Sequence, residues 1–298
     1  MSKTSKPVRR ALAIAAASAA TLLGSAAVQA EAIVGLTTTN ALVTFDSSMP
    51  TQAGALMSIT GLVGADERIL GIDLRPATGA IYGLGSAGNL YTLNAMTGAA
   101  TFVSGLSTAL SGTSFGVDFN PVVDRLRITS NAGQNLRTNV ATGATTVDGA
   151  LNGATTSISA AAYANNFAGT TSTTLYGING SAGMLYTQAP PNNGTLTAIG
   201  SLGVSASNVA GFDISGATGI AYASLTDGDT GKSGLYTIDL GTGAASLVGA
   251  FGMAGATAGS PPLLDITVAA VPEPETYALM LAGLVAVGSI ARRRRAKN

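Results

Sequence analysis

Four aspartates recur at the same place in a repeated sequence pattern, and this spacing makes them the first candidates for chemistry. They are Asp73, Asp118, Asp213 and Asp265, and Tyr163 stands at the corresponding place in the remaining copy. Carboxylates that meet in one site can hold Ca²⁺ or raise one another's pKa for acid–base catalysis. They can also accept backbone N–H groups, and residues repeated in register usually serve the fold of a repeat protein. The structural role is therefore favoured, and we expect no cofactor, with Ca²⁺ as the alternative.

A second candidate for calcium is the loop Asp227-Gly-Asp-Thr-Gly231. It resembles the start of a calcium-binding loop, in which alternate oxygens, here from Asp227 and Asp229, bind the ion and a glycine permits the bend. The bidentate acid that such a loop needs later in the sequence is missing, because the next acid, Asp239, falls at the end of an expected strand. A polar hairpin loop is the favoured interpretation.

Three arginines fall within one copy of the repeat, at Arg125, Arg127 and Arg137. Arginine binds carboxylates through two parallel hydrogen bonds, so this group could engage an acidic glycan. Exposed arginines on strands are more often solvated or paired, here with Asp124 or Asp148, and this second interpretation is favoured.

The chain of 298 residues contains no His and no Cys. This composition excludes thiol nucleophiles, Ser-His-Asp triads and zinc sites built on thiolate or imidazole ligands. Between Glu31 and Ala270 there are thirteen acids and six bases, which gives a net charge of −7. Nucleic-acid binding needs clustered Lys and Arg, so we expect no binding of DNA or RNA by an acidic body with scattered arginines.

The repeated aspartates belong to a unit that is clearest between Gly71 and Leu106. Four short runs of alternating apolar residues are separated there by turn-forming residues, which is typical of successive β-hairpins. The runs are Gly71–Leu74, Ala80–Leu84, Asn89–Asn94 and Ala100–Leu106. The first run returns at Gly116, Ala161 and Gly211, after steps of 45, 45 and 50 residues. A period near 45 residues is typical of four-stranded propeller blades.

The fifth unit is divided between the two ends of the body. Leu263–Ile266 repeats only the first strand, whereas three N-terminal segments resemble the second, third and fourth strands. These segments are Ala32–Leu36, Ala41–Asp46 and Ala55–Leu62. Pairing between the N- and C-terminal strands would close a ring and protect the sheet edges. The sequence therefore predicts an all-β fold, a five-bladed β-propeller of four-stranded antiparallel blades; a two-sheet sandwich or a β-solenoid is the alternative.

Residues 1–30 have the pattern of a secretory signal peptide. A basic start precedes an apolar stretch from Ala11 to Val28, and a small-x-small cleavage site ends at Ala30. We expect cleavage between Ala30 and Glu31, so that the mature chain starts at Glu31. An uncleaved membrane anchor is the alternative.

Residues 271–298 carry a second targeting pattern. A Pro-Glu-Pro motif precedes an apolar run of about 16 residues, a transmembrane helix that can just cross a thin bilayer, and a basic cluster follows. The motif consists of Pro272, Glu273 and Pro274, and the cluster consists of Arg292, Arg293, Arg294 and Arg295. By the positive-inside rule the arginines stay in the cytoplasm, which leaves the body outside.

This tail closely resembles the PEP-CTERM sorting signal of Gram-negative bacteria that make extracellular polysaccharide. The resemblance implies that a membrane exosortase is a partner and that it processes the chain near Pro-Glu-Pro. After a transient membrane-anchored stage, the body would be released or transferred to the cell surface or extracellular matrix. A plain membrane anchor formed by the tail is the alternative.

The body, residues 31–270, resembles the domain-of-unknown-function 4394 family. The resemblance rests on Gly71-Ile-Asp-Leu-Arg-Pro-Ala-Thr-Gly79 and Gly116-Val-Asp-Phe-Asn-Pro121, and it implies a repeat fold but no site. We expect an exported, non-enzymatic structural or binding module whose partner is extracellular polysaccharide or another surface protein. The alternative is a carboxylate-dependent hydrolase of extracellular polysaccharide, since such enzymes commonly use two acids.

Overall fold

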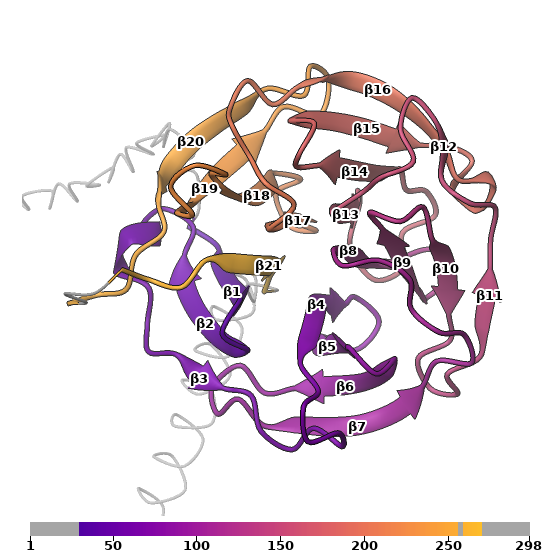
Figure 1. The fold of residues 1–298 in the computed structure, drawn as a ribbon, viewed down its shortest axis with the longest axis horizontal. Helices are drawn as coiled ribbons and strands as arrows, with labels where there is room; N and C mark the ends of the chain where they lie inside the picture. Colours follow the sequence, from indigo (N-terminus) through magenta and orange to yellow (C-terminus); the bar gives the residue numbers. More distant parts are fainter. Residues whose placement is uncertain (1–29, 256–258, 270–298) are drawn as a thin grey trace, which may run out of the picture.

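Five β-sheets surround a central axis in this protein (Figure 1). The structure is a computed structural model that describes residues 30–255 and 259–269. The arrangement confirms the predicted all-β, five-bladed propeller. The expected signal peptide up to residue 29 and the expected tail from residue 271 lie outside the described residues. Within the described ranges, no helix is both long enough and apolar enough to cross a membrane.

Four blades are formed by consecutive strands, numbered from the axis outward. The first of these blades contains β4 (Ile69–Arg75), β5 (Ala80–Gly85), β6 (Asn89–Leu93) and β7 (Ala100–Gly105). The next contains β8 (Phe115–Asn120), β9 (Arg125–Ser130), β10 (Asn135–Thr138) and β11 (Thr145–Val147). The third contains β13 (Ala160–Tyr163), β14 (Leu175–Asn179), β15 (Met184–Gln188) and β16 (Thr195–Ser201). The fourth contains β17 (Ala210–Ile214), β18 (Ala221–Thr226), β19 (Ser233–Ile238) and β20 (Ala245–Ala250).

The third blade has an addition that the sequence did not indicate. The two-residue strand β12 (Asn152–Gly153) pairs in parallel with the outer strand β16, which makes this sheet five-stranded. Two short 3₁₀ helices, η1 (Pro50–Gln52) and η2 (Pro191–Asn193), complete the regular structure.

The fifth blade joins the two ends of the body, as predicted. Its innermost strand is β21 (Leu263–Val268), and β1 (Ala32–Thr37) pairs antiparallel with β21 and with β2 (Ala41–Asp46). The outermost strand of this blade, β3 (Met57–Ser58), has only two residues. Pairing between β1 and β21 closes the ring.

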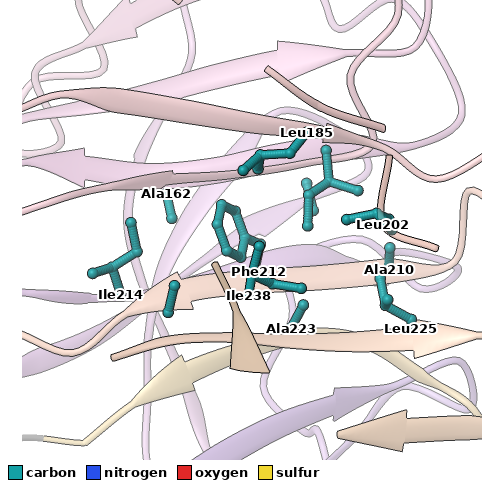
Figure 2. Close-up of a cluster of buried hydrophobic side chains, with 12 residues drawn as sticks. Ala162, Leu185, Leu202, Ala210, Phe212, Ile214, Ala223, Leu225 and Ile238 are labelled. Atoms are coloured by element: carbon teal, nitrogen blue, oxygen red, sulfur yellow. The ribbon is translucent and has the colours of Figure 1, made fainter. Parts of the chain in front are cut away.

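Apolar side chains that alternate along the strands pack between neighbouring blades. Figure 2 shows one such cluster, which contains Leu185 of the third blade together with Phe212 and Leu225 of the fourth. All three side chains are buried. Complete burial of an aliphatic or aromatic side chain contributes about 1.5–3 kcal/mol, and four such clusters each join side chains of two neighbouring blades.

The innermost strands approach one another closely, and glycine is what permits this. A Cβ atom on Gly211 of β17 would lie 2.5 Å from the Cα atom of Asp265 on β21. A Cβ atom on Gly116 of β8 would lie 2.7 Å from the backbone nitrogen of Ala161 on β13. Side chains near these positions therefore lie in a narrow, buried space around the axis.

Candidate functional site

Three carboxylates meet on the propeller axis. Asp73 of β4, Asp118 of β8 and Asp213 of β17 each offer an oxygen, and these oxygens lie within 4.8 Å of one another. Each residue is only 1% exposed. We call these three residues the axial carboxylate cluster.

Strand register explains why these three residues meet. Asp73 pairs with Tyr82 and Asp213 pairs with Tyr222, each a tyrosine of the second strand in its blade. In the third blade the equivalent tyrosine, Tyr176, pairs with Ala162. The axial position of the third blade is therefore Ala162, one residue before the expected Tyr163.

The fifth blade also differs from the expected register. Its axial position is held by Thr267, whose hydroxyl oxygen lies 3.1 Å from Asp73 Oδ1 and 3.1 Å from Asp213 Oδ2. Asp265 lies two residues earlier on β21 and accepts hydrogen bonds from the backbone nitrogens of Ile72 and Ile266, both at 2.9 Å. Asp265 therefore repeats the same kind of contact one layer away from the cluster.

A single rule describes the hydrogen bonds of the axial side chains. Each one accepts the N–H group of the residue just after the equivalent position on the next blade. The bonds run from Phe119 to Asp73 (2.7 Å), from Tyr163 to Asp118 (3.1 Å), from Val268 to Asp213 (2.6 Å) and from Leu74 to Thr267 (3.0 Å). Ala162 has no oxygen to offer, and the N–H group of Ile214 bonds to Asp213 Oδ1 instead. Four of the five blade interfaces thus gain a side-chain contact at the axis.

Burial and mutual repulsion disfavour ionisation of the axial carboxyls. Burial raises the pKa of Asp73 well above its ordinary value, and the nearby charge of Asp213 adds to this effect. Burial raises the pKa of Asp118 in the same way, with Asp73 as the next cause. Burial raises the pKa of Asp213 to about 6, against the effect of its hydrogen bonds.

Among the described residues, no ion pair supplies positive charge to the axial carboxylate cluster. The ion pairs found between described residues involve Asp124 and Asp148, and none reaches the axis. Asp118 Oδ2 is buried and has no hydrogen-bond partner among these residues. One oxygen of the cluster is therefore left unsatisfied.

A cavity of about 230 Å³, which we call the axial pocket, opens at one end of the axis. Its walls include Leu74, Ile214 and Val268, which directly follow three of the axial residues in their strands. The remaining lining residues are Pro76, Gly79, Asn166, Phe167, Ala168, Ser215, Gly216, Ala217 and Ala269. The pocket therefore lies one residue above the axial carboxylate cluster.

Asn166 connects the axial pocket to the cluster. Its Nδ2 atom donates to Asp213 Oδ1 at 3.4 Å, while its Oδ1 atom is buried and unpartnered within the described part of the chain. Neither Asn166 nor Thr267 stands out in the sequence as a candidate site residue. Asn166 lies in the long connection between the first and second strands of the third unit, and the length of this connection is the one feature of the sequence that could have pointed to it. Thr267 carries no sign of its own, because it stands two residues after an aspartate that fits the repeat.

The other predicted sites are structural in character. Asp227 Oδ1 accepts the backbone N–H groups of Asp229 (3.1 Å) and Thr230 (2.7 Å) and the Thr230 hydroxyl (2.8 Å). These bonds lower the pKa of the exposed Asp227 carboxyl and close the hairpin turn. Asp227 and Asp229 belong to no group of three or more acids with converging oxygens within the ranges that the structure describes.

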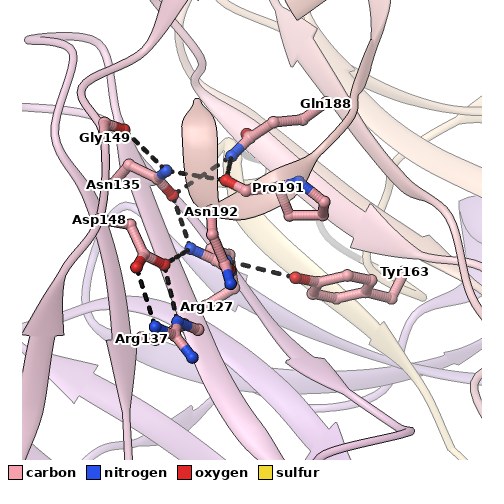
Figure 3. A network of polar contacts seen from close by, with 9 residues as sticks. All are labelled: Arg127, Asn135, Arg137, Asp148, Gly149, Tyr163, Gln188, Pro191 and Asn192. Carbon is pink, nitrogen blue, oxygen red and sulfur yellow. Dashed lines mark hydrogen bonds and ion pairs between the residues drawn. The ribbon is translucent and has the colours of Figure 1, made fainter. Parts of the chain in front are cut away.

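Arg127 is the centre of a buried polar network between the second and third blades (Figure 3). Its guanidinium donates to Asp148 Oδ2 (2.6 Å), Asn135 Oδ1 (2.8 Å), Asn192 Oδ1 (2.7 Å) and the Tyr163 hydroxyl (3.2 Å). Arg137 donates to the same Asp148 carboxylate, at 2.8 Å and 3.0 Å. Arg125 instead donates to the backbone oxygens of Val123 and Asp124. The three arginines therefore do not form one binding surface.

Comparison with known families identifies both parts of the sequence. The family model described as "Domain of unknown function (DUF4394)" matches residues 41–259, well over half of the chain. The chain belongs to this family. The PEP-CTERM protein-sorting motif matches residues 270–295. This match confirms the resemblance of the tail to a PEP-CTERM signal and indicates export through an exosortase to the cell surface of a Gram-negative bacterium. The motif residues Pro272, Glu273 and Pro274 and the cluster Arg292–Arg295 lie outside the described residues.

Several solved structures resemble this DUF4394 chain at low identity. A structural genomics protein of unknown function from Bacteroides thetaiotaomicron is 17% identical with a TM-score of 0.49, over 80% of this chain and 66% of that chain. A chain from a nidogen/laminin complex is 11% identical with a TM-score of 0.48, over 81% and 99%. A putative 6-phosphogluconolactonase from Bacteroides uniformis is 12% identical with a TM-score of 0.40, over 74% and 82%. No curated protein matches the sequence. These likenesses carry no argument about function.

Proposed function

We propose that this DUF4394 protein is a non-enzymatic binding module of the cell surface or extracellular matrix, with the axial pocket as its ligand site. The chemical character of the residues that line the axial pocket is the observation that supports this proposal. An aromatic ring, an amide and main-chain groups meet there, and none of the lining residues has a titratable side chain. Such a pocket can bind and orient a ligand, whereas acid–base catalysis needs a titratable group within reach of the substrate.

The chemistry of the axial pocket fits a neutral sugar unit of an extracellular polysaccharide. Phe167 is 48% exposed, so its ring is available to the apolar face of a sugar. Asn166 also lines the pocket, so its side-chain amide is a polar group that can meet a sugar hydroxyl there. The volume of about 230 Å³ suits one ring better than a longer segment. A loop of another surface protein is the alternative occupant.

Both ends of the body reach the same face as the axial pocket. The Glu31 carboxylate accepts hydrogen bonds from the hydroxyls of Ser215 and Thr218, and Ser215 lines the pocket. Ala269 also lines the pocket, and its N–H group donates to the backbone oxygen of Ala32 at 2.8 Å. The expected tail at residue 271 therefore begins two residues after Ala269, a residue of the pocket lining.

The alternative function, hydrolysis of polysaccharide by paired aspartates, has less support. A glycoside hydrolase needs two carboxyl groups that flank the scissile bond. The three axial carboxylates are each 1% exposed, and each accepts an N–H group of the next blade. This burial leaves them no contact with a substrate in the axial pocket.

Binding of neutral oligosaccharides tests the proposed ligand site. Calorimetric titration of the exported chain with hexose, deoxyhexose and N-acetylhexosamine oligomers should give dissociation constants on the order of 0.1–1 mM, as expected for one small ring. Phe167→Ala should weaken binding about tenfold, because the apolar contact is lost. Phe102→Ala is the matched control, since Phe102 is also 48% exposed but lies on the outer strand β7.

Equal weakening by both substitutions, or no binding of any neutral oligomer by the unaltered chain, would reject the ligand site. Binding of a protein partner that Phe167→Ala abolishes would reject the sugar and keep the pocket. Export is tested separately by deletion of Arg292–Arg295. We expect the tail to remain unprocessed after this deletion, and unchanged processing would count against the exosortase step.

A further inference from the structure

We propose that Asp73, Asp118 and Asp213 form a calcium site on the propeller axis. Nothing in this inference depends on the ligand of the axial pocket. It concerns the layer beneath the pocket, where the three innermost strands bring their carboxylates together.

The distances fit a bound cation. Calcium binds oxygen at about 2.3–2.6 Å, so two oxygens on opposite sides of the ion lie about 4.6–5.2 Å apart. The offered oxygens of the cluster lie within 4.8 Å of one another. The carboxylates also come from three different blades, so a central ion would join these blades at the axis.

The hydrogen bonds that the three carboxylates accept leave lone pairs free for a cation, and one oxygen accepts no hydrogen bond from the described residues. Each carboxylate uses an oxygen to accept an N–H group of the next blade, and a carboxylate oxygen has a further lone pair. Asp118 Oδ2 accepts no hydrogen bond at all, although it is buried. A buried polar atom without a partner is unfavourable, and a bound cation would supply the missing partner.

The Thr267 hydroxyl supports the same conclusion. Its oxygen lies 3.1 Å from oxygens of both Asp73 and Asp213, and it accepts the N–H group of Leu74. A threonine hydroxyl has one hydrogen to donate, so it can satisfy only one of the two carboxylates. The oxygen of the other carboxylate that faces Thr267 therefore keeps a lone pair that a cation can use.

Calcium fits this site better than magnesium or a transition metal. All the offered ligand atoms are carboxylate oxygens, which hard cations prefer. Magnesium demands near-ideal octahedral geometry and keeps several waters, whereas calcium accepts irregular oxygen cages. Calcium sites in extracellular modules have dissociation constants of about 0.1–1 mM, and the sorting motif directs this chain to the cell surface.

The first test measures thermal unfolding and metal content of the full chain. Calcium chloride at about one hundred times the dissociation constant should raise Tm by about 5–10 °C over the value in EGTA. Magnesium chloride should give a smaller shift. Equilibrium dialysis followed by elemental analysis should find one calcium per chain. The inference is overturned if Tm is the same in calcium and EGTA and the unaltered chain retains no calcium, or if magnesium gives the larger shift.

The second test uses matched Asp→Asn variants. Asp118→Asn should weaken calcium binding at least about tenfold, because an amide replaces the charged ligand. Asp227→Asn is the control, since it alters the other sequence-predicted calcium candidate, in an exposed hairpin loop, and should keep the full shift in Tm. The opposite result, with the shift kept by Asp118→Asn and lost by Asp227→Asn, would place the ion in the loop. The dialysis result with the unaltered chain remains decisive if a variant fails to fold.

Discussion

Two groups of buried charges in this propeller are built in opposite ways. Between the second and third blades, the Asp148 carboxylate meets the guanidinium groups of Arg127 and Arg137. On the axis, Asp73, Asp118 and Asp213 meet one another, and no Lys or Arg side chain among the described residues pairs with them. Both groups join neighbouring blades, but only the first contains its own counter-charge.

The pKa values of the carboxyl groups shift in opposite directions in the two places. Burial opposes ionisation of Asp148, but the hydrogen bonds from Arg137 and Arg127 outweigh it and hold the pKa of that carboxyl below its ordinary value. On the axis burial acts with the neighbouring charges, and the pKa of Asp118 is raised. The Arg127 network is therefore complete as a structural unit, whereas the axial carboxylate cluster needs added positive charge. Removing one carboxylate should therefore lower the free energy of unfolding in the Arg127 network and slightly raise it in the axial carboxylate cluster.

The largest effect is expected from Asp148→Asn. Arg127 is only 1% exposed, so this change leaves a buried guanidinium without its charge partner. Breaking a buried ion pair in this way costs about 3–5 kcal/mol of unfolding free energy. Denaturant unfolding of the two proteins in EGTA measures the difference.

Asp124→Asn provides the control for this prediction. Asp124 pairs with Arg75 but its side chain is 37% exposed, so its loss should cost less than about 1 kcal/mol. If Asp148→Asn costs no more than Asp124→Asn, the Arg127 network does not depend on its internal counter-charge.

A smaller effect is expected from Thr267→Val. The valine side chain has the shape of threonine but lacks the hydroxyl, so the hydrogen bond from this hydroxyl to the Asp73 or Asp213 carboxyl group is lost. The loss of a hydrogen bond to a buried carboxylate costs about 1–3 kcal/mol of unfolding free energy, while the N–H group of Leu74 keeps Asp73 Oδ1 as an acceptor at 2.7 Å. Thr267→Ser keeps the hydroxyl and should retain most of the stability, as measured by denaturant unfolding. Equal losses in both variants would show that the methyl group, and not the hydroxyl, is what matters at this position.

A modest effect is expected on the acid side of the stability profile. The folded-state pKa of Asp148 lies below its ordinary value of 3.8, so in acid the unfolded chain binds more protons at this group. The stability that Asp148 contributes is present above pH 3.8 and is lost as the pH falls through the lower, folded-state pKa. As the pH falls from about 4 to about 2, the urea midpoint should therefore decline more steeply for the unaltered chain than for Asp148→Asn. Parallel profiles for the two proteins would contradict the assignment.

The sequence was sufficient to predict the ring of blades but not the exact membership of the axial cluster. Strong alternation and glycine-rich turns defined the units, and the incomplete units at Ala32 and Leu263 required closure. Side chains on a strand alternate with a period of two, so a shift of two residues keeps the same face. Asp265 and Thr267 therefore both fit the repeat, and the sequence pattern alone favoured the aspartate. Only the pairing of β21 with β1 places Thr267 at the axis.

The predicted axial residue of the third blade was wrong for a different reason. Its innermost strand β13 reads Ala-Ala-Ala-Tyr, which offers no polar residue at the axial position and no contrast between its two faces. Aligning Tyr163 with the aspartates was therefore a slip of one residue, which placed it on the wrong face of the strand. The partners of Arg127 were also only partly accessible from sequence. Asp148 lies on the same blade, whereas Asn192 comes from a neighbouring blade 65 residues away.

The smallest effect is expected from Asp118→Asn in EGTA. The amide oxygen of asparagine can still accept the N–H group of Tyr163, and the amide nitrogen replaces the carboxylate oxygen that has no partner. The change also removes repulsion with Asp73 and Asp213. The unfolding free energy near pH 7 should therefore change by less than about 1 kcal/mol, and in the stabilising direction. A loss as large as that of Asp148→Asn would mean that Asp118 already has a partner in the calcium-free protein, and the contrast between the two buried groups would then fail.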